Sequence, residues 1–238
     1  MRVLAIESSS VTASAAIVTD DIVTAEYTTN FKQTHSQTLL PMIDEICTMT
    51  ESPIESIDLI AVSSGPGSFT GLRIGSATGK GIGLALDKPI VSVPTLDALA
   101  MNVIGTDRLV CPVMDARRGN VYTGIYRFDY GCDKDESGLL EILLESSLMQ
   151  TEKLIERLNE MQQSVIFLGD AAAFYSDVIK EKMTVPFIFA PAHMSMPRAA
   201  SVAVLGMRMQ ACGKAANARE HVPDYLRPSQ AERERNNQ

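Results

Sequence analysis

The sequence predicts an α/β fold built from two similar halves. Short apolar runs bounded by turn residues predict strands, and segments with apolar residues every three or four positions predict helices. The order strand, strand, strand, helix, strand, helix occurs twice along the 238 residues. Because strands and helices in this order form mixed sheets covered by helical layers, we expect two α/β domains. We place them at residues 1–104 and 105–228, followed by a charged, Asn/Gln-rich and disordered tail at 229–238.

The first half begins with three short strands. They are expected at residues 3–6, 13–18 and 22–28, and two more strands at 57–62 and 90–93. Helices are expected at residues 36–49, 70–86 and 96–103. The first of these helices places Leu39, Ile43 and Ile46 on one stripe. Its Pro41 lies in the first turns, where the early N–H groups have no partner within the helix.

The second half repeats this order without repeating the sequence. Strands are expected at residues 109–114, 120–128, 139–144 and 165–168, and helices at 151–161, 171–183 and 198–211. Self-similarity of this kind indicates a repeat of architecture.

Composition restricts the class of protein. The apolar run Val3–Ile6 is cut off by Glu7 and is shorter than the about 7–15 residues of a signal peptide's apolar region. No apolar run reaches the roughly 20 residues of a membrane span. The four cysteines form no CxxC pair, which favours reduced thiols over a disulfide or zinc framework. We therefore expect a cytoplasmic protein. A net charge of -8 is poorly suited to binding a nucleic-acid backbone alone.

Glycines recur every four residues along the second expected helix. Gly71, Gly75, Gly79 and Gly83 form one stripe, and each costs roughly 1 kcal/mol relative to alanine. A close approach by another backbone would offset this cost. We favour a helix of another subunit, with packing inside the domain as the alternative. A phosphate-binding loop is the third interpretation, although the pattern GxxxxGK[ST] is absent.

Few residues are arranged for chemistry. The three histidines show no metal-binding spacing such as HxxxH, and the nucleophile motif GxSxG is absent. Two acids end corresponding strands of the two halves, Glu7 before Ser8-Ser9 and Asp115 before Arg117-Arg118. A phosphate–metal site would form at such strand ends in this architecture. The alternative is that each acid bonds the turn that follows it.

Several segments together resemble one family. They are Val3–Ser9, Thr34–Pro41, Ser64–Gly75, Val113–Tyr122 and Asp224–Arg227, of which Ser64–Gly75 is the most specific. Across nearly its whole length the chain resembles the TsaB (YeaZ) family. This family belongs to the bacterial machinery that places threonylcarbamoyl on adenosine 37 of tRNA. The resemblance implies an actin-like, sugar-kinase-like (ribonuclease H-like) fold, with two βββαβα domains around a degenerate cleft.

The resemblance also implies a lost active site. The paralogous transferase TsaD carries a His-x-x-x-His metal pair, and at the matching positions this chain has Val93 and Asp97. We therefore expect no metal, no catalytic residue and no cofactor beyond a weakly bound adenine nucleotide at a subunit interface. The residues of a vestigial nucleotide site would be Glu7, Ser8, Ser9, Asp115, Arg117, Arg118 and Gly169.

The function implied is that of a non-catalytic scaffold and activator. It would bind a TsaD-like protein, with a TsaE-like ATPase, for threonylcarbamoyl transfer to tRNAs that read codons beginning with adenine. Alone it would form a homodimer through the same surface, and it would meet tRNA only within the complex. The interface residues implied are His35, Leu39, Leu40, Ile43, Phe69, Gly71, Leu72, Arg73, Gly75, Ser76, Gly79 and Gly83. A glycoprotease-like metallopeptidase and a sugar-kinase-like ATPase are the alternatives.

Overall fold

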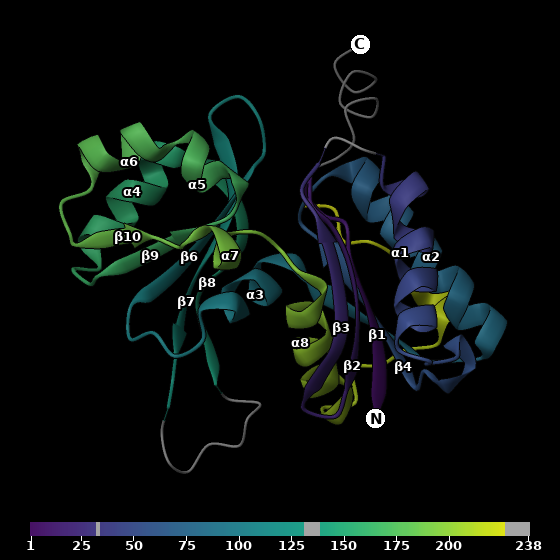
Figure 1. The fold of residues 1–238 in the computed structure, drawn as a ribbon. Helices are drawn as coiled ribbons and strands as arrows, with labels where there is room; N and C mark the ends of the chain where they lie inside the picture. Colours follow the sequence, from purple (N-terminus) through teal and green to yellow (C-terminus); the bar gives the residue numbers. More distant parts are fainter. Residues whose placement is uncertain (32–33, 131–138, 227–238) are drawn as a thin grey trace.

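Two mixed sheets form the centre of the chain (Figure 1). The computed structural model describes residues 1–31, 34–130 and 139–226. The first sheet contains β1 (Arg2–Glu7), β2 (Ala13–Thr19), β3 (Ile22–Thr29), β4 (Leu59–Gly65) and β5 (Ile90–Pro94). The second contains β6 (Leu109–Asp115), β7 (Asn120–Phe128), β8 (Leu140–Gln150), β9 (Val165–Leu168) and β10 (Phe187–Phe189).

The two sheets share one topology. The first has the strand order β3-β2-β1-β4-β5, and the second has the corresponding order β8-β7-β6-β9-β10. In each, three antiparallel strands are followed by two parallel ones. The predicted α/β class and the repeat of architecture are thus confirmed.

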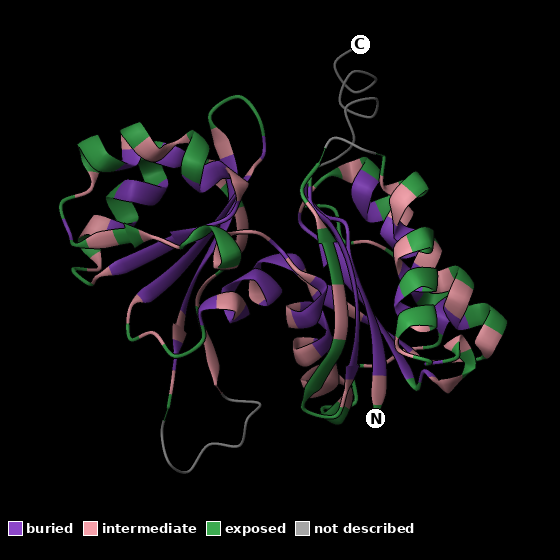
Figure 2. Cartoon of the chain, viewed as in Figure 1, coloured by how far each residue is buried: buried purple, intermediate pink, exposed green. Residues whose placement is uncertain are grey.

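Helices cover both faces of the first sheet. On one face lie α1 (His35–Met49) and α2 (Phe69–Leu86), and on the other lies α8 (Ala199–Ala211) (Figure 1). In β1, Leu4 and Ile6 pack toward α1 and α2, whereas Val3 and Ala5 pack toward α8. A strand buried on both faces needs apolar residues throughout, which explains the uninterrupted run of β1. In Figure 2 the strands β1, β2 and β4 are mostly buried, whereas the edge strand β3 and the outer sides of the helices are largely exposed.

The second sheet is covered in the same manner. One face carries α4 (Thr151–Glu160), α5 (Asp170–Phe174) and α6 (Ser176–Lys182) (Figure 1). The opposite face packs against α3 (Thr95–Ala100) and η2 (Met101–Val103), with α7 (Ala192–Ser195) close by. Two further short 3-10 helices are η1 (Ile54–Ser56) and η4 (Ala218–Glu220).

The two domains exchange helices. The helix α3 follows the last strand of the first sheet and also packs on the second, through Leu96 and Leu99 against Val110 and Tyr126. The helix α8 follows the last strand of the second sheet but packs on the first. The expected domains, 1–104 and 105–228, follow the chain order, whereas residues 199–226 pack with the first sheet and α3 contacts both sheets.

Other predicted elements changed length or divided. The helix expected at 171–183 is interrupted at Tyr175, where φ is -98° and ψ is 14°. The strand β8 runs past the expected end to Gln150, since register shifts in its pairing with β7 disturb the alternation. The three-residue strand β10 is too short to leave a periodic signal. The expected tail at 229–238 lies outside the described residues. Within the described ranges, no helix is long and apolar enough to cross a membrane.

Candidate functional site: the α1–α2 face and the interdomain turns

The start of α2 packs tightly on the turn after β1. The Ser68 side chain caps the helix by accepting a hydrogen bond from the Gly71 amide at 3.3 Å. A Cβ atom on Gly71 would lie 2.0 Å from the Ser8 carbonyl oxygen, and one on Gly75 would lie 2.2 Å from Ser8 Oγ. The Ser8 hydroxyl donates to the Gly71 carbonyl at 2.9 Å. Only glycine lets the two backbones meet at this separation.

The remainder of the glycine stripe also faces its own domain. A Cβ on Gly79 would lie 2.5 Å from Val62 Cγ2, and one on Gly83 would lie 2.8 Å from the Ala218 Cβ. The expectation that this stripe contacts another subunit is therefore wrong, because the first sheet and the C-terminal segment already fill the space. Several residues expected at an interface are buried within the domain, namely Leu39, Ile43, Gly71, Leu72, Gly75, Ser76, Gly79 and Gly83.

Four of the expected interface residues keep some exposure. Leu40 on α1 is 56% exposed, and Arg73 on α2 is exposed as well. Phe69 is partly buried beneath the Arg73 guanidinium, which lies 4.1 Å from the ring centroid. His35 Nε2 lies 2.8 Å from the Ser10 carbonyl oxygen and ties the start of α1 to the β1–β2 turn. We call the outer surface of α1 and α2, with Leu40, Arg73, Met49 and Leu84 exposed, the α1–α2 face.

The C-terminal segment completes this side of the domain. Ile90 of β5 and Ala216 exchange two backbone hydrogen bonds, and Lys80 Nζ donates to the Arg219 carbonyl at 2.7 Å. Farther along, the Tyr225 ring stacks 4.7 Å from that of Phe69, and its hydroxyl accepts from Arg73 Nε at 3.3 Å. Lys80 is thus engaged by protein carbonyls, which disfavours the phosphate-loop interpretation. The segment Asp224–Arg227 resembled the end of the family's sequence, but the sequence did not show that this segment packs on α2. Arg227 lies outside the described residues.

Glu7 is turned inward at the end of β1. Its Oε1 accepts hydrogen bonds from the Ser9 amide at 2.6 Å and from the Ser9 hydroxyl at 2.5 Å. The carboxyl group is fully buried, and desolvation raises its pKa more than these hydrogen bonds lower it. Its Oε2 has no hydrogen-bond partner among the described residues. The carboxyl group therefore bonds the turn that follows its own strand and is not exposed to solvent.

In the matching turn of the second domain, backbone amides are hydrogen-bonded by two Asp side chains. The Asp115 amide donates to Asp170 Oδ1 at 3.0 Å, and Asp115 Oδ1 accepts from the Arg117 amide at 2.9 Å. Arg117 and Arg118 take left-handed φ values of 68° and 58°. Gly169 packs on Val113, since a Cβ there would lie 2.1 Å from the Val113 carbonyl oxygen. Asp170 therefore joins the start of α5 to the end of β6, and burial raises the pKa of its carboxyl group.

Comparison with known proteins identifies the family. The model of the family described as TsaD: tRNA N6-adenosine threonylcarbamoyltransferase matches residues 23–235. The Bacillus subtilis tRNA threonylcarbamoyladenosine biosynthesis protein TsaB is 34% identical over 98% of this chain and 96% of its own length. The Escherichia coli protein of the same name is 28% identical over 95% of each chain. The chain belongs to the TsaB family. The predicted family is thereby confirmed.

Solved structures agree with this membership. A Pseudomonas aeruginosa protein described as similar to the peptidase YeaZ matches with a TM-score of 0.79 at 25% identity, covering 95% of this chain and 99% of the other. YeaZ from the same organism matches with a TM-score of 0.78 at 24% identity, covering 94% and 99%. The fold of this TsaB-family chain is thus the predicted two-domain α/β one, with two sheets of matching strand order.

The positions compared with the transferase metal pair do not suit a metal in this TsaB-family chain. Val93 is buried in β5 and has no donor atom. Asp97 Oδ1 accepts a hydrogen bond from the Tyr126 hydroxyl at 2.9 Å, and desolvation raises the pKa of Asp97. Across the described residues, no group of three or more His, Cys, Asp or Glu side chains could hold a metal ion. Asp97 instead fastens α3 to β7.

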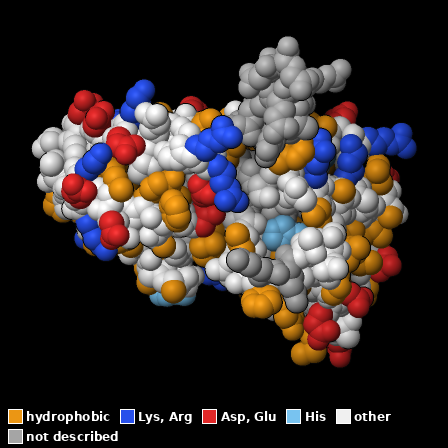
Figure 3. Space-filling view, turned by 90° about the horizontal axis from the view of Figure 1, so that it is seen from above, with side chains coloured by type: hydrophobic (Ala, Val, Ile, Leu, Met, Phe, Trp, Pro, Cys, Tyr) orange, Lys and Arg blue, Asp and Glu red, His pale blue; other side chains and the backbone are white. Residues whose placement is uncertain are grey.

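Surface charge on this TsaB-family chain is mixed. In the view from above, Lys and Arg side chains lie beside Asp and Glu over both domains (Figure 3). On the described part of this face, Lys and Arg side chains form no broad basic patch.

Proposed function

We propose that this chain is a non-catalytic subunit of threonylcarbamoyl transfer to adenosine 37 of tRNAs that read codons beginning with adenine. It binds a TsaD-like protein, assembles with a TsaE-like ATPase and activates the transferase. Its membership of the TsaB family supports a role in tRNA threonylcarbamoyladenosine biosynthesis. The work takes place in the cytoplasm.

The non-catalytic role is supported chiefly by Val93 and Asp97, neither of which is available to bind a metal. The chain matches the model of a transferase family, yet one of these positions has no donor atom and the other is committed to Tyr126. Metal-assisted catalysis needs fixed donors with an open coordination position. The acids at the two turns are likewise engaged, Glu7 by Ser9 and Asp115 by the Arg117 amide. Reaction therefore takes place on the partner.

The α1–α2 face is the surface we propose for that partner. Two adjacent helices with exposed apolar side chains, Leu40, Met49 and Leu84, can pack against two helices of another chain as a four-helix contact. A second copy of this chain occupies the same face when the partner is absent. Any adenine nucleotide binds weakly and at a subunit interface. The turns after β1 and β9 leave it little room, because Glu7 is buried in the first and Gly169 packs against Val113 in the second. Contact with tRNA is made only through the complex.

Co-purification with a TsaD-like protein tests the partnership. A stable complex that reconstitutes threonylcarbamoyl transfer supports the proposal, and two proteins that elute separately at micromolar concentration contradict it. The same preparation is assayed for hydrolysis of a generic protein substrate and for ATP turnover by this chain alone. Activity in either assay would favour the metallopeptidase or the kinase-like alternative.

A further inference from the structure

Two chain crossovers connect the domains. The outbound one leaves β5 at Pro94 and enters α3 at Thr95, and the return one comprises residues 196–198 and enters α8 at Ala199. A rigid rotation of one domain against the other has to bend both crossovers. The outbound one is fixed at its start, because Ser64 Oγ donates to the Val93 carbonyl at 3.1 Å and the Gly65 amide donates to Thr95 Oγ1 at 3.2 Å.

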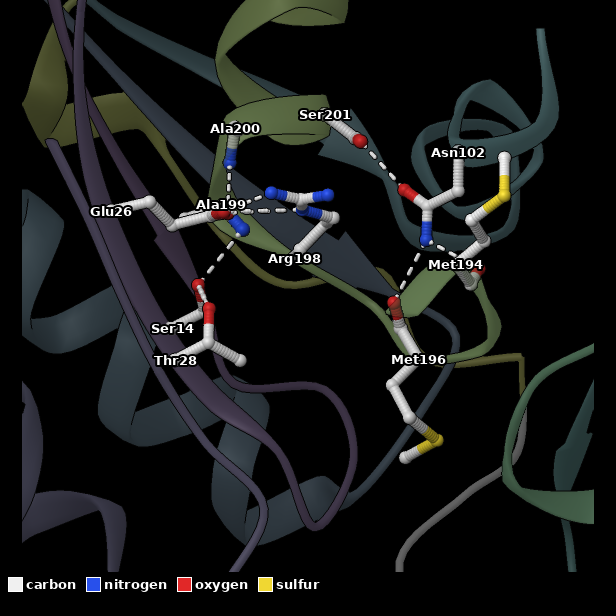
Figure 4. A network of polar contacts seen from close by, with 10 residues as sticks. All are labelled: Ser14, Glu26, Thr28, Asn102, Met194, Met196, Arg198, Ala199, Ala200 and Ser201. Carbon is white, nitrogen blue, oxygen red and sulfur yellow. Dashed lines mark hydrogen bonds and ion pairs between the residues drawn. The ribbon is translucent and has the colours of Figure 1, made fainter. Parts of the chain in front are cut away.

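The return crossover is fixed to the first sheet by Glu26 (Figure 4). This β3 carboxylate forms an ion pair with Arg198 and accepts a hydrogen bond from the Ala200 amide at 2.9 Å. Beside it, Ser14 Oγ accepts from the Ala199 amide at 3.0 Å. The first amides of α8, which have no partner within the helix, are thus satisfied by the first sheet. The Glu26 side chain is 11% exposed, so little water competes with it.

Asn102 joins the return crossover to the end of α3. Its Nδ2 donates to the carbonyl oxygens of Met194 at 3.0 Å and Met196 at 2.8 Å, and its Oδ1 accepts from the Ser201 hydroxyl at 2.6 Å (Figure 4). Asn102 lies in η2, whose neighbours Met101 and Val103 pack on the second sheet, whereas Ser201 lies on α8 of the first domain. One amide therefore spans both domains and the crossover between them.

We propose that Glu26, Arg198, Asn102 and Ser201 form an interdomain latch that holds the two domains at one angle. Rotation about the crossovers would separate Asn102 from Ser201 and strain its bond to the Met196 carbonyl, whereas Met194 packs with the second domain and would move with Asn102. A partly buried polar group that is left unpaired destabilises the rotated state, and a connected network loses its contacts together. The chain then presents both domains to a partner as one rigid body. This inference does not depend on the identity of that partner.

Distance measurement between spin labels tests the latch. Labels are attached at Glu45→Cys on α1 and at Glu156→Cys on α4, both exposed positions in different domains. Cys111 is retained, because it is buried and burial raises the pKa of its thiol to about 12. The other native cysteines, Cys47, Cys132 and Cys212, are replaced with serine.

In the otherwise wild-type protein, we expect one narrow distribution of distances between the two labels. Addition of magnesium–ATP should not shift this distribution. In the double variant Glu26→Gln with Asn102→Ala, we expect this peak to broaden or shift. Glu141→Gln is the matched control, because it weakens the ion pair with Arg127 inside the second domain and leaves the crossovers intact. If the double variant does not fold, Ser201→Ala removes a single contact of the network and is expected to broaden the peak less. Several distances in the wild type, or an unchanged peak in the folded latch variants, would overturn the proposal.

Discussion

Gly79 of α2 lies directly on Val62 of β4, where a Cβ atom would come within 2.5 Å of Cγ2. Substitution of Gly79 by Leu should therefore destabilise the isolated chain. Overpacking costs about 1–3 kcal/mol, and loss of a helical glycine returns at most roughly 1 kcal/mol. Thermal unfolding of the dilute monomer should show a lower Tm, by a few degrees for a chain of this size.

Gly81 supplies the control on the same helix. It faces open space, with no atom within 4 Å of an added Cβ. Gly81→Ala should leave packing unchanged and raise stability by up to about 1 kcal/mol. If Gly79→Leu left the monomer Tm unchanged while abolishing association, the stripe would face a partner after all.

Leu40 tests the α1–α2 face without disturbing the core. The side chain is 56% exposed, so Leu40→Glu should leave the Tm nearly unchanged. Burying the new carboxylate against an apolar partner surface should weaken binding of the TsaD-like protein about tenfold or more, or roughly 1.4 kcal/mol. Calorimetric titration of the partner measures the loss. Ile188→Glu, at a 42% exposed position on β10 of the second domain, should bind as the wild type does. Equal loss in both variants would exclude Leu40 as a specific contact.

Glu7 gives the folded chain a pH dependence that can be removed. Burial raises its pKa in the folded state above the unfolded value, so the folded chain holds the proton to higher pH. The contribution of Glu7 to stability is thus present at low pH and is lost as pH rises from about 4 through the raised pKa. Glu7→Gln keeps a neutral group that can accept from Ser9. Relative to the wild type, the variant should gain stability as pH rises through this window, measured by urea unfolding at several pH values. A difference that stays constant with pH would contradict the assignment.

Sequence periodicity predicted most of the strands and helices because burial on the sheet faces leaves a local pattern. The runs of β1 and β6 and the stripe of Leu39, Ile43 and Ile46 are of this kind. The exchange of α3 and α8 left no such pattern. An apolar stripe shows that a helix is covered, but it does not show by which sheet.

The same limit applied to the candidate site. The glycine stripe indicated a close approach, but a glycine carries no information about its neighbour, and the neighbour was Ser8 and Val62. The acids at Glu7 and Asp115 were correctly placed at strand ends. Their orientation toward Ser9 and the Arg117 amide depends on turn geometry, which the sequence did not reveal. The contacts of Asn102 join segments about a hundred residues apart and had no local signal.

Reconstituted transfer of threonylcarbamoyl to tRNA measures the central claim most directly. The assay supplies threonylcarbamoyl-adenylate and tRNA to this chain alone, to its TsaD-like partner alone and to both together. We predict no modified adenosine from this chain alone and efficient transfer only when both proteins are present. Modified tRNA formed by this chain alone, or full activity of the partner without it, would contradict the role of a non-catalytic activating subunit.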